Sequence, residues 1–272
     1  MSVLFRKSLC SLPLAGAALL LAGCAVTGSL ADRSPPALTT ERIAAIVASP
    51  DRSANDRTSD ARRKPVELLA FIGVRPGMTV LDVSAGGGYT SELLARAVGP
   101  TGHVYGQSPP PRPDASGQTP PFSRSAMALN QRAKSPAAAH LSAVARPFDN
   151  PVPTELPVSS LDLVTLMFNY HDFGSMGVDR AAMNKAIFAA LKPGGLYVVG
   201  DHAGRTGTGI SESNTLHRVE ENFVVSEVEA AGFRLAERGS FLRNPNDPRD
   251  RETPQPPQPK DEFVLKFVKP AG

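Results

Sequence analysis

The hydrophobic positions of the chain fall into short apolar runs that are separated by longer amphipathic stretches. Residues 78–83 (MTVLDV) and 161–168 (LDLVTLMF) are mostly apolar at consecutive positions, as in strands that are buried on both faces. Residues 178–191 instead place Met183, Ile187 and Leu191 at the spacing of one helix face. Strands that alternate with helices in this way predict parallel βαβ units and an α/β fold.

The same pattern, punctuated by glycine and proline, predicts the order of the elements along the chain. Residues 107–122 are rich in proline and are expected to form a loop, and the last two strands are expected to pair antiparallel because no helix separates them. The predicted helices cover residues 39–49, 62–73, 90–98, 126–133, 178–191 and 220–231, and the predicted strands cover residues 78–83, 103–106, 141–145, 161–168, 196–201, 233–241 and 262–268.

The first 23 residues have the features of an export signal. Arg6 and Lys7 precede an apolar run over 11–23 that is too short to cross a bilayer comfortably. The run leads into Leu-Ala-Gly-Cys at 21–24, which resembles the lipobox of bacterial lipoproteins and implies cleavage before Cys24 and its acylation. The alternative is an apolar N-terminal helix that happens to contain a cysteine.

This resemblance implies a domain order and a location. Residues 1–23 would be a signal peptide, residues 24–38 a flexible tether of small, polar and proline residues, and residues 39–272 one folded domain. The lipidated Cys24 would anchor the protein to a membrane of the bacterial cell envelope, facing the periplasm.

Charge and cysteine content exclude several kinds of partner and site. The net charge is only +3, and basic residues alternate with acidic ones, as over 56–64, so this stretch is expected to be a solvated surface. Nucleic acid is therefore not expected as a partner. Both cysteines, Cys10 and Cys24, lie near the start of the chain, which excludes a disulfide framework or a cysteine-based zinc site in the folded body.

Four motifs occur in an order that resembles the class I S-adenosylmethionine-dependent methyltransferases. They are VLDVSAGGGY at 80–89, LDLV at 161–164, LKPGG at 191–195 and EAAGF at 229–233. GVRPGM at 73–78, NYHD at 169–172 and GDH at 200–202 narrow the resemblance to a group of bacterial predicted methyltransferases. The resemblance implies a Rossmann-like seven-stranded sheet, mostly parallel with an antiparallel last strand, with helices on both faces and S-adenosylmethionine as cofactor.

The resemblance also implies which residues bind the cofactor. Glycines after a strand permit a tight turn and let a ligand approach the backbone closely. Gly86 and Gly88 would line the pocket, Asp82 would position the amino end of the cofactor or the loop, and Asn169 would lie at the end of a neighbouring strand. Asp149 would lie near the adenine amino group; alternatively it is a surface aspartate of a turn.

Two residues depart from the pattern of the family. Ser84 stands where the first glycine of the turn is usual, which is tolerable if Ser84 keeps an ordinary φ. Gln107 stands where an acidic residue usually holds both ribose hydroxyls. A glutamine lacks the charge and the bidentate geometry of a carboxylate, so the affinity for a nucleotide would be weaker or the ligand would differ.

His171 and His202 follow the fourth and fifth predicted strands, at the carboxyl edge where open α/β sheets bind ligands. We assign them as catalytic residues, with His171 favoured as the base that removes a proton from the methyl acceptor. One alternative is that both rings only hydrogen-bond to loops. Another is a divalent metal ion held by His171, Asp172, His202 and His217, but strand-end spacing alone does not define ligand geometry, so no metal site is assigned.

The sequence thus predicts a methyltransferase that acts on a small-molecule acceptor. The alternative is a non-catalytic, ligand-binding envelope lipoprotein of the same fold. The predicted export signal and the glutamine at position 107 both favour this alternative. A nicotinamide oxidoreductase is disfavoured because the glycines at 86–88 do not form G-x-G-x-x-G. The two proline-rich insertions, 107–122 and the one before the last strand, are expected either to cover the site as lids or to remain surface loops.

Overall fold

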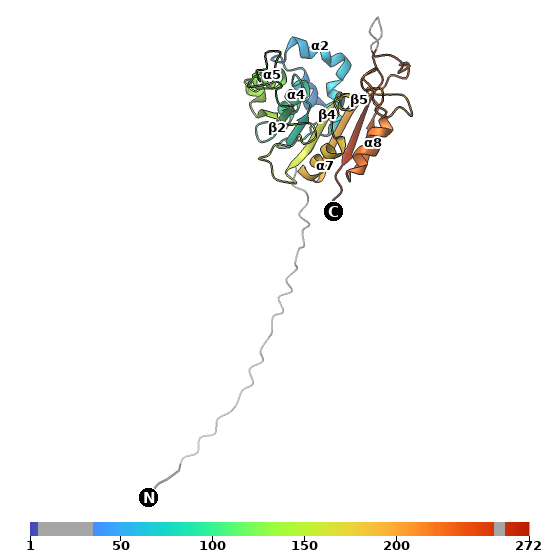
Figure 1. Ribbon diagram of the computed structural model, residues 1–272. Coiled ribbons are helices and arrows are strands. Elements are labelled where there is room, and N and C mark those ends of the chain that lie inside the picture. Colours follow the sequence, from blue (N-terminus) through green and yellow to red (C-terminus); the bar gives the residue numbers. More distant parts are fainter. Residues whose placement is uncertain (5–34, 253–258, 272) are drawn as a thin grey trace. The chain divides into compact units, whose positions relative to one another are not determined.

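The computed structural model describes residues 1–4, 35–252 and 259–271 (Figure 1). The chain divides into two units, Met1–Ser34 and Pro35–Gly272, and every element named below belongs to the second. The predicted signal peptide apart from its first four residues, the acylation site Cys24 and most of the predicted tether lie outside the described residues. Within the described part of the chain, no helix is long and apolar enough to cross a membrane.

Seven strands form one sheet in the order β3-β2-β1-β4-β5-β7-β6. The first five of these pair in parallel, and β7 pairs antiparallel with both of its neighbours. The predicted seven-stranded, mostly parallel sheet with an antiparallel last strand is confirmed. The strands are β1 (Thr79–Val83), β2 (His103–Ser108), β3 (Leu141–Ala145), β4 (Leu161–Met167), β5 (Leu191–His202), β6 (Arg234–Gly239) and β7 (Glu262–Val268).

Capping residues mark several of the helix ends. Thr39 and Asp179 each cap a helix by accepting a backbone N–H, and Gly73 ends a helix with φ +72°. Strand β2 extends two residues into the loop predicted over 107–122, and residues 109–122 contain neither helix nor strand. The helices are α1 (Thr40–Val47), α2 (Ala54–Arg63), α3 (Pro65–Ile72), α4 (Tyr89–Val98), α5 (Arg124–Arg132), α6 (Asp172–Ser175), α7 (Arg180–Ala190) and α8 (Glu221–Ala230), with a 3₁₀ turn at Pro136–Ala138.

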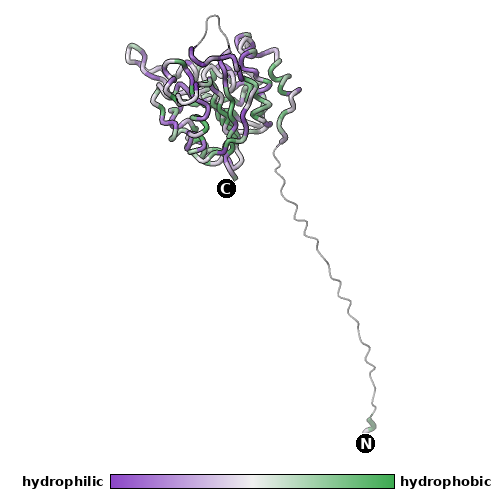
Figure 2. The backbone as a smooth tube through the Cα atoms, turned by 90° about the vertical axis from the view of Figure 1, so that its right-hand side faces the viewer, coloured by the Kyte–Doolittle hydropathy of each residue, from purple (hydrophilic) through white to green (hydrophobic). Residues whose placement is uncertain are grey.

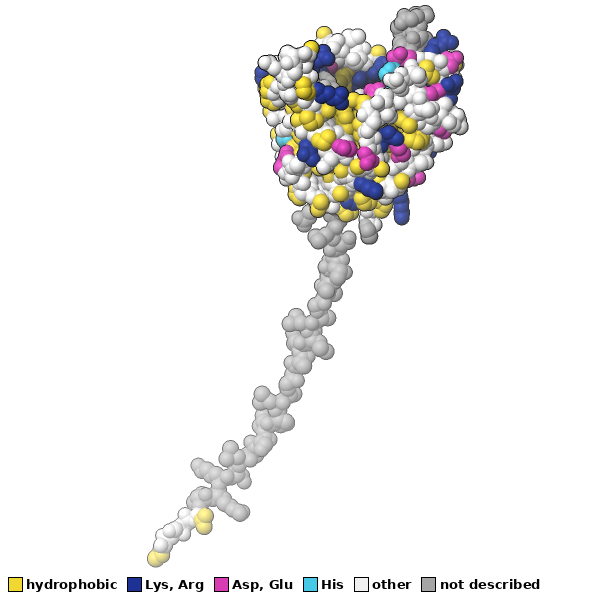
Figure 3. Space-filling model, viewed as in Figure 1, with side chains coloured by type: hydrophobic (Ala, Val, Ile, Leu, Met, Phe, Trp, Pro, Cys, Tyr) yellow, Lys and Arg dark blue, Asp and Glu magenta, His cyan; other side chains and the backbone are white. Residues whose placement is uncertain are grey.

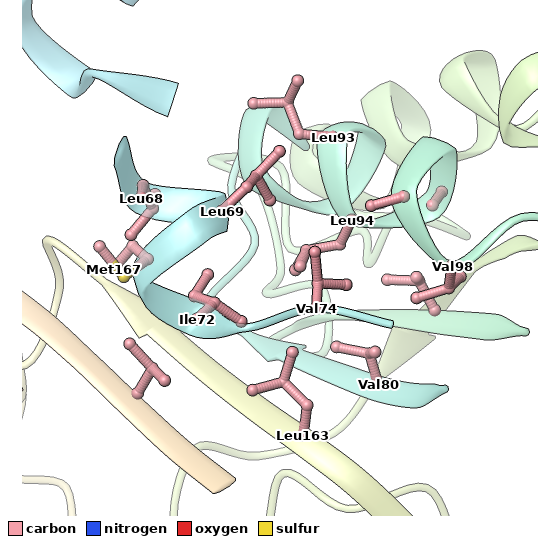
Figure 4. Close-up of a cluster of buried hydrophobic side chains, with 14 of the residues drawn as sticks. Leu68, Leu69, Ile72, Val74, Val80, Leu93, Leu94, Val98, Leu163 and Met167 are labelled. Carbon is pink, nitrogen blue, oxygen red and sulfur yellow. The ribbon is translucent and has the colours of Figure 1, made fainter. Parts of the chain in front are cut away.

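Helices cover both faces of the sheet because consecutive strand residues point to opposite sides. Val80 contributes to a core with α1, α3, α4 and α5, whereas its neighbour Leu81 contributes to a second core with α7 and α8. Figure 4 shows part of the first core, where leucines of α3 and α4 meet Val80 and Leu163 of the sheet. In Figure 2 the hydrophobic segments accordingly gather in the middle of the domain.

The apolar pattern does not predict helix α2, and it also misses the short helix α6 and the 3₁₀ turn at Pro136–Ala138. Helix α2 covers most of the charged stretch 56–64 that was expected to form a solvated surface, yet its Asp56 is buried and ion-paired with Arg132. The sequence does contain a signal for the start of α2, namely the capping box at 53–56, in which the Ser53 side chain accepts a hydrogen bond from the N–H of Asp56. In Figure 1 this helix lies along the upper side of the domain.

Candidate functional site

The turn between β1 and α4 is held in an unusual backbone conformation. Ser84, Gly86 and Gly88 have φ values of +55°, +54° and +81°. The expectation that Ser84 keeps an ordinary φ is therefore wrong. A left-handed serine costs about 1–2 kcal/mol, and its N–H compensates by donating a 2.8 Å hydrogen bond to the Gln107 side chain.

Gln107 supports this turn and does not face an open ribose site. Its side chain is fully buried; Oε1 accepts from the backbone of Ser84, and Nε2 donates to the carbonyl oxygen of Arg146 at 2.6 Å. The Gln107 carbonyl oxygen also accepts the N–H of Ala85 at 2.8 Å. Both polar groups of the amide are thus engaged, and the predicted role in holding ribose hydroxyls does not fit this arrangement.

A cavity of about 260 Å³ lies against the turn, and we call it the glycine-turn cavity. Helix α2 forms one wall and the carboxyl ends of β1 and β4 form another. None of its lining residues comes from 109–122 or from the described part of the insertion before β7. Its lining residues are Asn55, Asp56, Ser59, Arg63, Asp82, Ser84, Ala85, Gly86, Gly87, Tyr89, Thr90, Arg132, Met167 and Asn169.

The two glycines assigned to the cofactor have different surroundings. Gly86 lines the cavity, and a Cβ built on it would have no neighbour closer than 4.0 Å. Gly88 is absent from the lining, and a Cβ there would meet side-chain atoms of Leu129 and Arg132 at 2.8 Å. Gly88 is therefore required for packing against α5, whereas Gly86 leaves its side open to a ligand.

Asp82 is one of two acidic residues that line the cavity and, unlike Asp56, which is paired with Arg132, it has no ion-pair partner among the described residues. It is buried at the end of β1, where it accepts hydrogen bonds from the hydroxyls of Ser91 at 2.5 Å and Thr165 at 2.7 Å. Burial raises the pKa of Asp82 to about 6, although both hydroxyls favour its ionised form. A carboxylate held in this way has lone pairs left for a cation and gains stability when one arrives.

Arg63 is one of two basic residues that line the cavity and, unlike Arg132, has no ion-pair partner among the described residues. Its guanidinium lies over the rings of Tyr89 and Phe168, at 4.9 Å and 5.0 Å from their centroids. Burial, reinforced by the neighbouring Arg62, lowers the pKa of Arg63. A half-buried guanidinium whose stacking partners are uncharged keeps its donors available for an anion. Arg63 was not among the predicted site residues because the charged stretch 56–64 has the pattern of a solvated surface.

The remaining predicted cofactor residues divide between the cavity and the surface. Asn169 lines the cavity, and its side chain donates to the carbonyl oxygen of Met167 at 3.2 Å. Asp149 is exposed in the turn after β3 and lies outside the lining of the cavity. Its position matches the alternative prediction of a surface aspartate.

Three histidines converge at the carboxyl ends of β4 and β5. The rings of His171 and His202 are 5.3 Å apart, and the rings of His171 and His217 are 5.7 Å apart. The prediction that His171 and His202 follow adjacent strands is confirmed by the pairing of β4 with β5. We call His171, His202 and His217, together with Asp172 and Asp201, the histidine cluster.

His171 is enclosed by carboxylates. Its Nδ1 donates to Asp201 Oδ1 at 2.6 Å, and its Nε2 lies 3.1 Å from Asp172 Oδ1. Burial alone would lower the pKa of His171, but the two carboxylates outweigh burial and raise the pKa to about 9. At neutral pH the ring therefore holds its proton and has no free nitrogen, so this geometry does not suit the general base that the sequence predicted.

His202 connects the cluster to the glycine-turn cavity. Its Nδ1 lies 2.9 Å from Glu262 Oε1, a contact that is close enough for an ion pair but is out of line for a hydrogen bond. Its ring stacks on Phe168 with centroids 5.6 Å apart. Because Arg63 contacts the same phenylalanine, the cavity and the cluster are neighbours that share one aromatic ring.

Comparison with known proteins identifies the fold. No family model and no curated protein matches the sequence. A SAM-dependent methyltransferase from Aquifex aeolicus aligns over 85% of this chain and 99% of its own, with a TM-score of 0.56 and 17% identity. An arsenic(III) S-adenosylmethionine methyltransferase from Chlamydomonas reinhardtii aligns over 87% of this chain and 74% of its own, with a TM-score of 0.53 and 16% identity.

The [4+2]-cyclase SpnF also matches, over 88% of this chain and 100% of its own, with a TM-score of 0.52 and 15% identity. The architecture is therefore the Rossmann-like fold found in S-adenosylmethionine-dependent methyltransferases. A cyclase on the same architecture means that the fold by itself does not define the reaction.

Proposed function

We propose that this protein is an S-adenosylmethionine-dependent methyltransferase that acts on a small-molecule acceptor. The observation that carries the proposal is the pairing of opposite charges in the glycine-turn cavity. Asp82 and Arg63 line the same cavity, beside a turn that Gly86 leaves open. An acid and a base placed in this way complement the ammonium and the carboxylate of an amino acid, which is the methionine end of the cofactor.

Each of these residues has a separate task in the proposed site. Asp82, held by Ser91 and Thr165, would accept hydrogen bonds from the ammonium group. Arg63, held over two aromatic rings, would donate to the carboxylate. When bound, S-adenosylmethionine supplies the electrophilic methyl carbon, so the work left to this chain is to position the reactants and exclude water.

The size of the cavity gives α2 a role in binding. Ligand sites commonly have volumes of ~300–1,000 Å³, and this cavity has about 260 Å³. Four residues of α2 form its wall. We therefore expect α2 to move outward when the whole cofactor binds.

Calorimetry with S-adenosylmethionine and S-adenosylhomocysteine tests the proposal. Arg63→Gln and Asp82→Asn should each weaken binding by about 10–100-fold, the value of one charged hydrogen-bonding partner. Arg57→Gln is the matched control, because Arg57 lies on the same helix but is exposed and outside the cavity, and it should leave binding unchanged. A folded protein that binds neither ligand would overturn the proposal and favour a non-catalytic protein with another ligand.

We further propose that the protein is anchored in the bacterial cell envelope through acylated Cys24, with the domain facing the periplasm. The support is the order of basic residues, apolar run and Leu-Ala-Gly-Cys at 21–24. Cys24→Ser should abolish incorporation of labelled palmitate and leave an uncleaved precursor, whereas Cys10→Ser should label normally. A wild-type protein that takes up no label would contradict this proposal.

A further inference from the structure

We propose that His171, Asp172 and His217 form a binding site for one divalent transition-metal ion. Asp172 Oδ1 lies 3.1 Å from Nε2 of His171 and 3.2 Å from Nδ1 of His217. The three ligand atoms all lie within 4.8 Å of one another. Ligands bound at ~2.1 Å from one ion lie roughly 3 Å apart when they are neighbours in its coordination shell, so small movements would bring all three onto a common ion.

The arrangement around His171 is that of a metal-binding imidazole. A histidine that binds a metal through one ring nitrogen usually donates its other N–H to a carboxylate, which fixes the tautomer and the orientation of the ring. Here Nδ1 donates to Asp201, and the Asp201 carboxylate also accepts the backbone N–H groups of His171 and His202, each at 2.7 Å. Asp201 is fully buried and cannot turn away. Nε2 is therefore directed toward Asp172 and His217, and it would release its proton to solvent when an ion binds.

The ligand set indicates the class of ion. Two imidazoles and one carboxylate suit Zn²⁺ or Fe²⁺, whereas Mg²⁺ and Ca²⁺ prefer sites made of oxygen ligands. The Asp172 and His217 side chains are 33% and 42% exposed, so coordination positions on their side would stay open to a ligand. On the face drawn in Figure 3, a histidine side chain is exposed at the upper rim beside acidic side chains.

The place of the metal site in the fold suggests which ligand would bind at the open coordination positions of the ion. The rings of His202 and Phe168 form a chain of contacts from His171 to Arg63 of the glycine-turn cavity. If the proposed methyl transfer holds, the favoured acceptor class is a molecule that offers an oxygen or a thiol to the ion. Metal binding itself does not depend on that function, because none of the three ligands lines the cavity.

Metal binding by the purified full chain tests the proposal without any cofactor. After removal of metals with a chelator, the protein is dialysed against Zn²⁺ and the bound metal is counted by mass spectrometry. Co²⁺ then serves as a spectroscopic probe, since its visible absorption reports imidazole coordination. We expect one tightly bound ion per chain, and we expect His217→Ala and Asp172→Asn to remove it. Both side chains are partly exposed, so these variants should fold, which circular dichroism checks.

Matched controls separate this site from adventitious binding. His140→Ala removes a histidine that hydrogen-bonds to α4, far from the cluster in the sequence and outside it, and should leave the bound metal unchanged. Cys10 and Cys24 could also bind Zn²⁺, so the comparison is repeated in the Cys10→Ser, Cys24→Ser background. Asp201→Asn should weaken binding by about 10–100-fold through the orientation of His171. Equal metal content and equal Co²⁺ spectra in wild type and His217→Ala would overturn the proposal.

Discussion

The glycine-turn cavity and the histidine cluster lie at the same edge of the sheet, yet they are built in different ways. The cavity is shaped by the backbone: Ser84, Gly86 and Gly88 all take left-handed φ values, and a glutamine from β2 holds the turn. The cluster is shaped by side chains. His171 and Asp201 come from the ends of two strands, and His217 comes from the loop that follows β5.

This difference predicts how each region responds to mutation. Replacing a glycine in a turn that depends on left-handed φ values should destabilise the protein, even where the added Cβ would contact no other atom. Removing one charge from a network of buried charges should also destabilise the protein, because the partners of that charge remain buried without compensation. The predictions below test this contrast, beginning with the largest expected effect.

Removing the central carboxylate should have the largest effect. Asp201 accepts three hydrogen bonds, two from His171 and one from the backbone of His202. Asp201→Ala should therefore lower the free energy of unfolding by about 3–5 kcal/mol, measured by chemical denaturation. Asp250→Ala removes an exposed carboxylate and should change it by less than about 0.5 kcal/mol. A loss below about 1 kcal/mol for Asp201→Ala would mean that the cluster does not depend on its charges.

The two glycines of the turn should differ when each is replaced by alanine. Gly88→Ala combines a left-handed φ with contacts at 2.8 Å to Leu129 and Arg132, so it should cost about 2–4 kcal/mol of stability. Gly86→Ala has the strained φ alone and should cost about 1–2 kcal/mol, but it should weaken cofactor binding because its side faces the cavity. Thermal denaturation and calorimetry on both variants measure the two effects. Equal loss of stability in both would contradict the assigned packing role of Gly88.

Cofactor affinity should depend on pH through Asp82. The pKa of this buried carboxyl is about 6 in the folded protein, and its ordinary value is 3.8. Its contribution to folding stability is thus present below about pH 4 and is lost as the pH rises through 6. Binding of a cation has the opposite sign, because only the ionised form attracts it. At pH 5 about one tenth of the group is ionised, so affinity should be about tenfold lower than at pH 7. Asp82→Asn should flatten this profile, and an unchanged slope in the variant would assign the dependence to another group.

Most of the fold could be predicted from the sequence because buried parallel strands are continuous apolar runs. Residues 78–83 and 161–168 contain the observed β1 and β4. Helix α2 was missed because its buried residue, Asp56, is charged and forms an ion pair with Arg132 of α5. Apolar periodicity contains no signal for such a helix.

The site was predictable where it depends on the backbone and not where it depends on tertiary pairing. The pattern of a strand followed by glycines predicted the positions of the turn and of Asp82. The roles of Gln107 and His171 depend on which strand end lies beside which, and His171 meets Asp201 only because β4 pairs with β5. A motif identifies which residues lie at a strand end. Whether a glutamine there can bind a ligand, or a histidine can accept a proton, depends on their hydrogen-bond partners in the folded protein.

The smallest expected effect is at Asp149, where the prediction from the family pattern and the observed structure disagree. The resemblance placed this carboxylate near the adenine amino group, but the side chain is exposed and outside the cavity lining. Asp149→Ala should therefore change the affinity for S-adenosylmethionine by less than about twofold, because an exposed side chain without a partner contributes little. Asp82→Asn, measured in parallel, shows the response of a residue inside the cavity. A tenfold loss at Asp149 would mean that the turn after β3 closes onto the bound nucleoside.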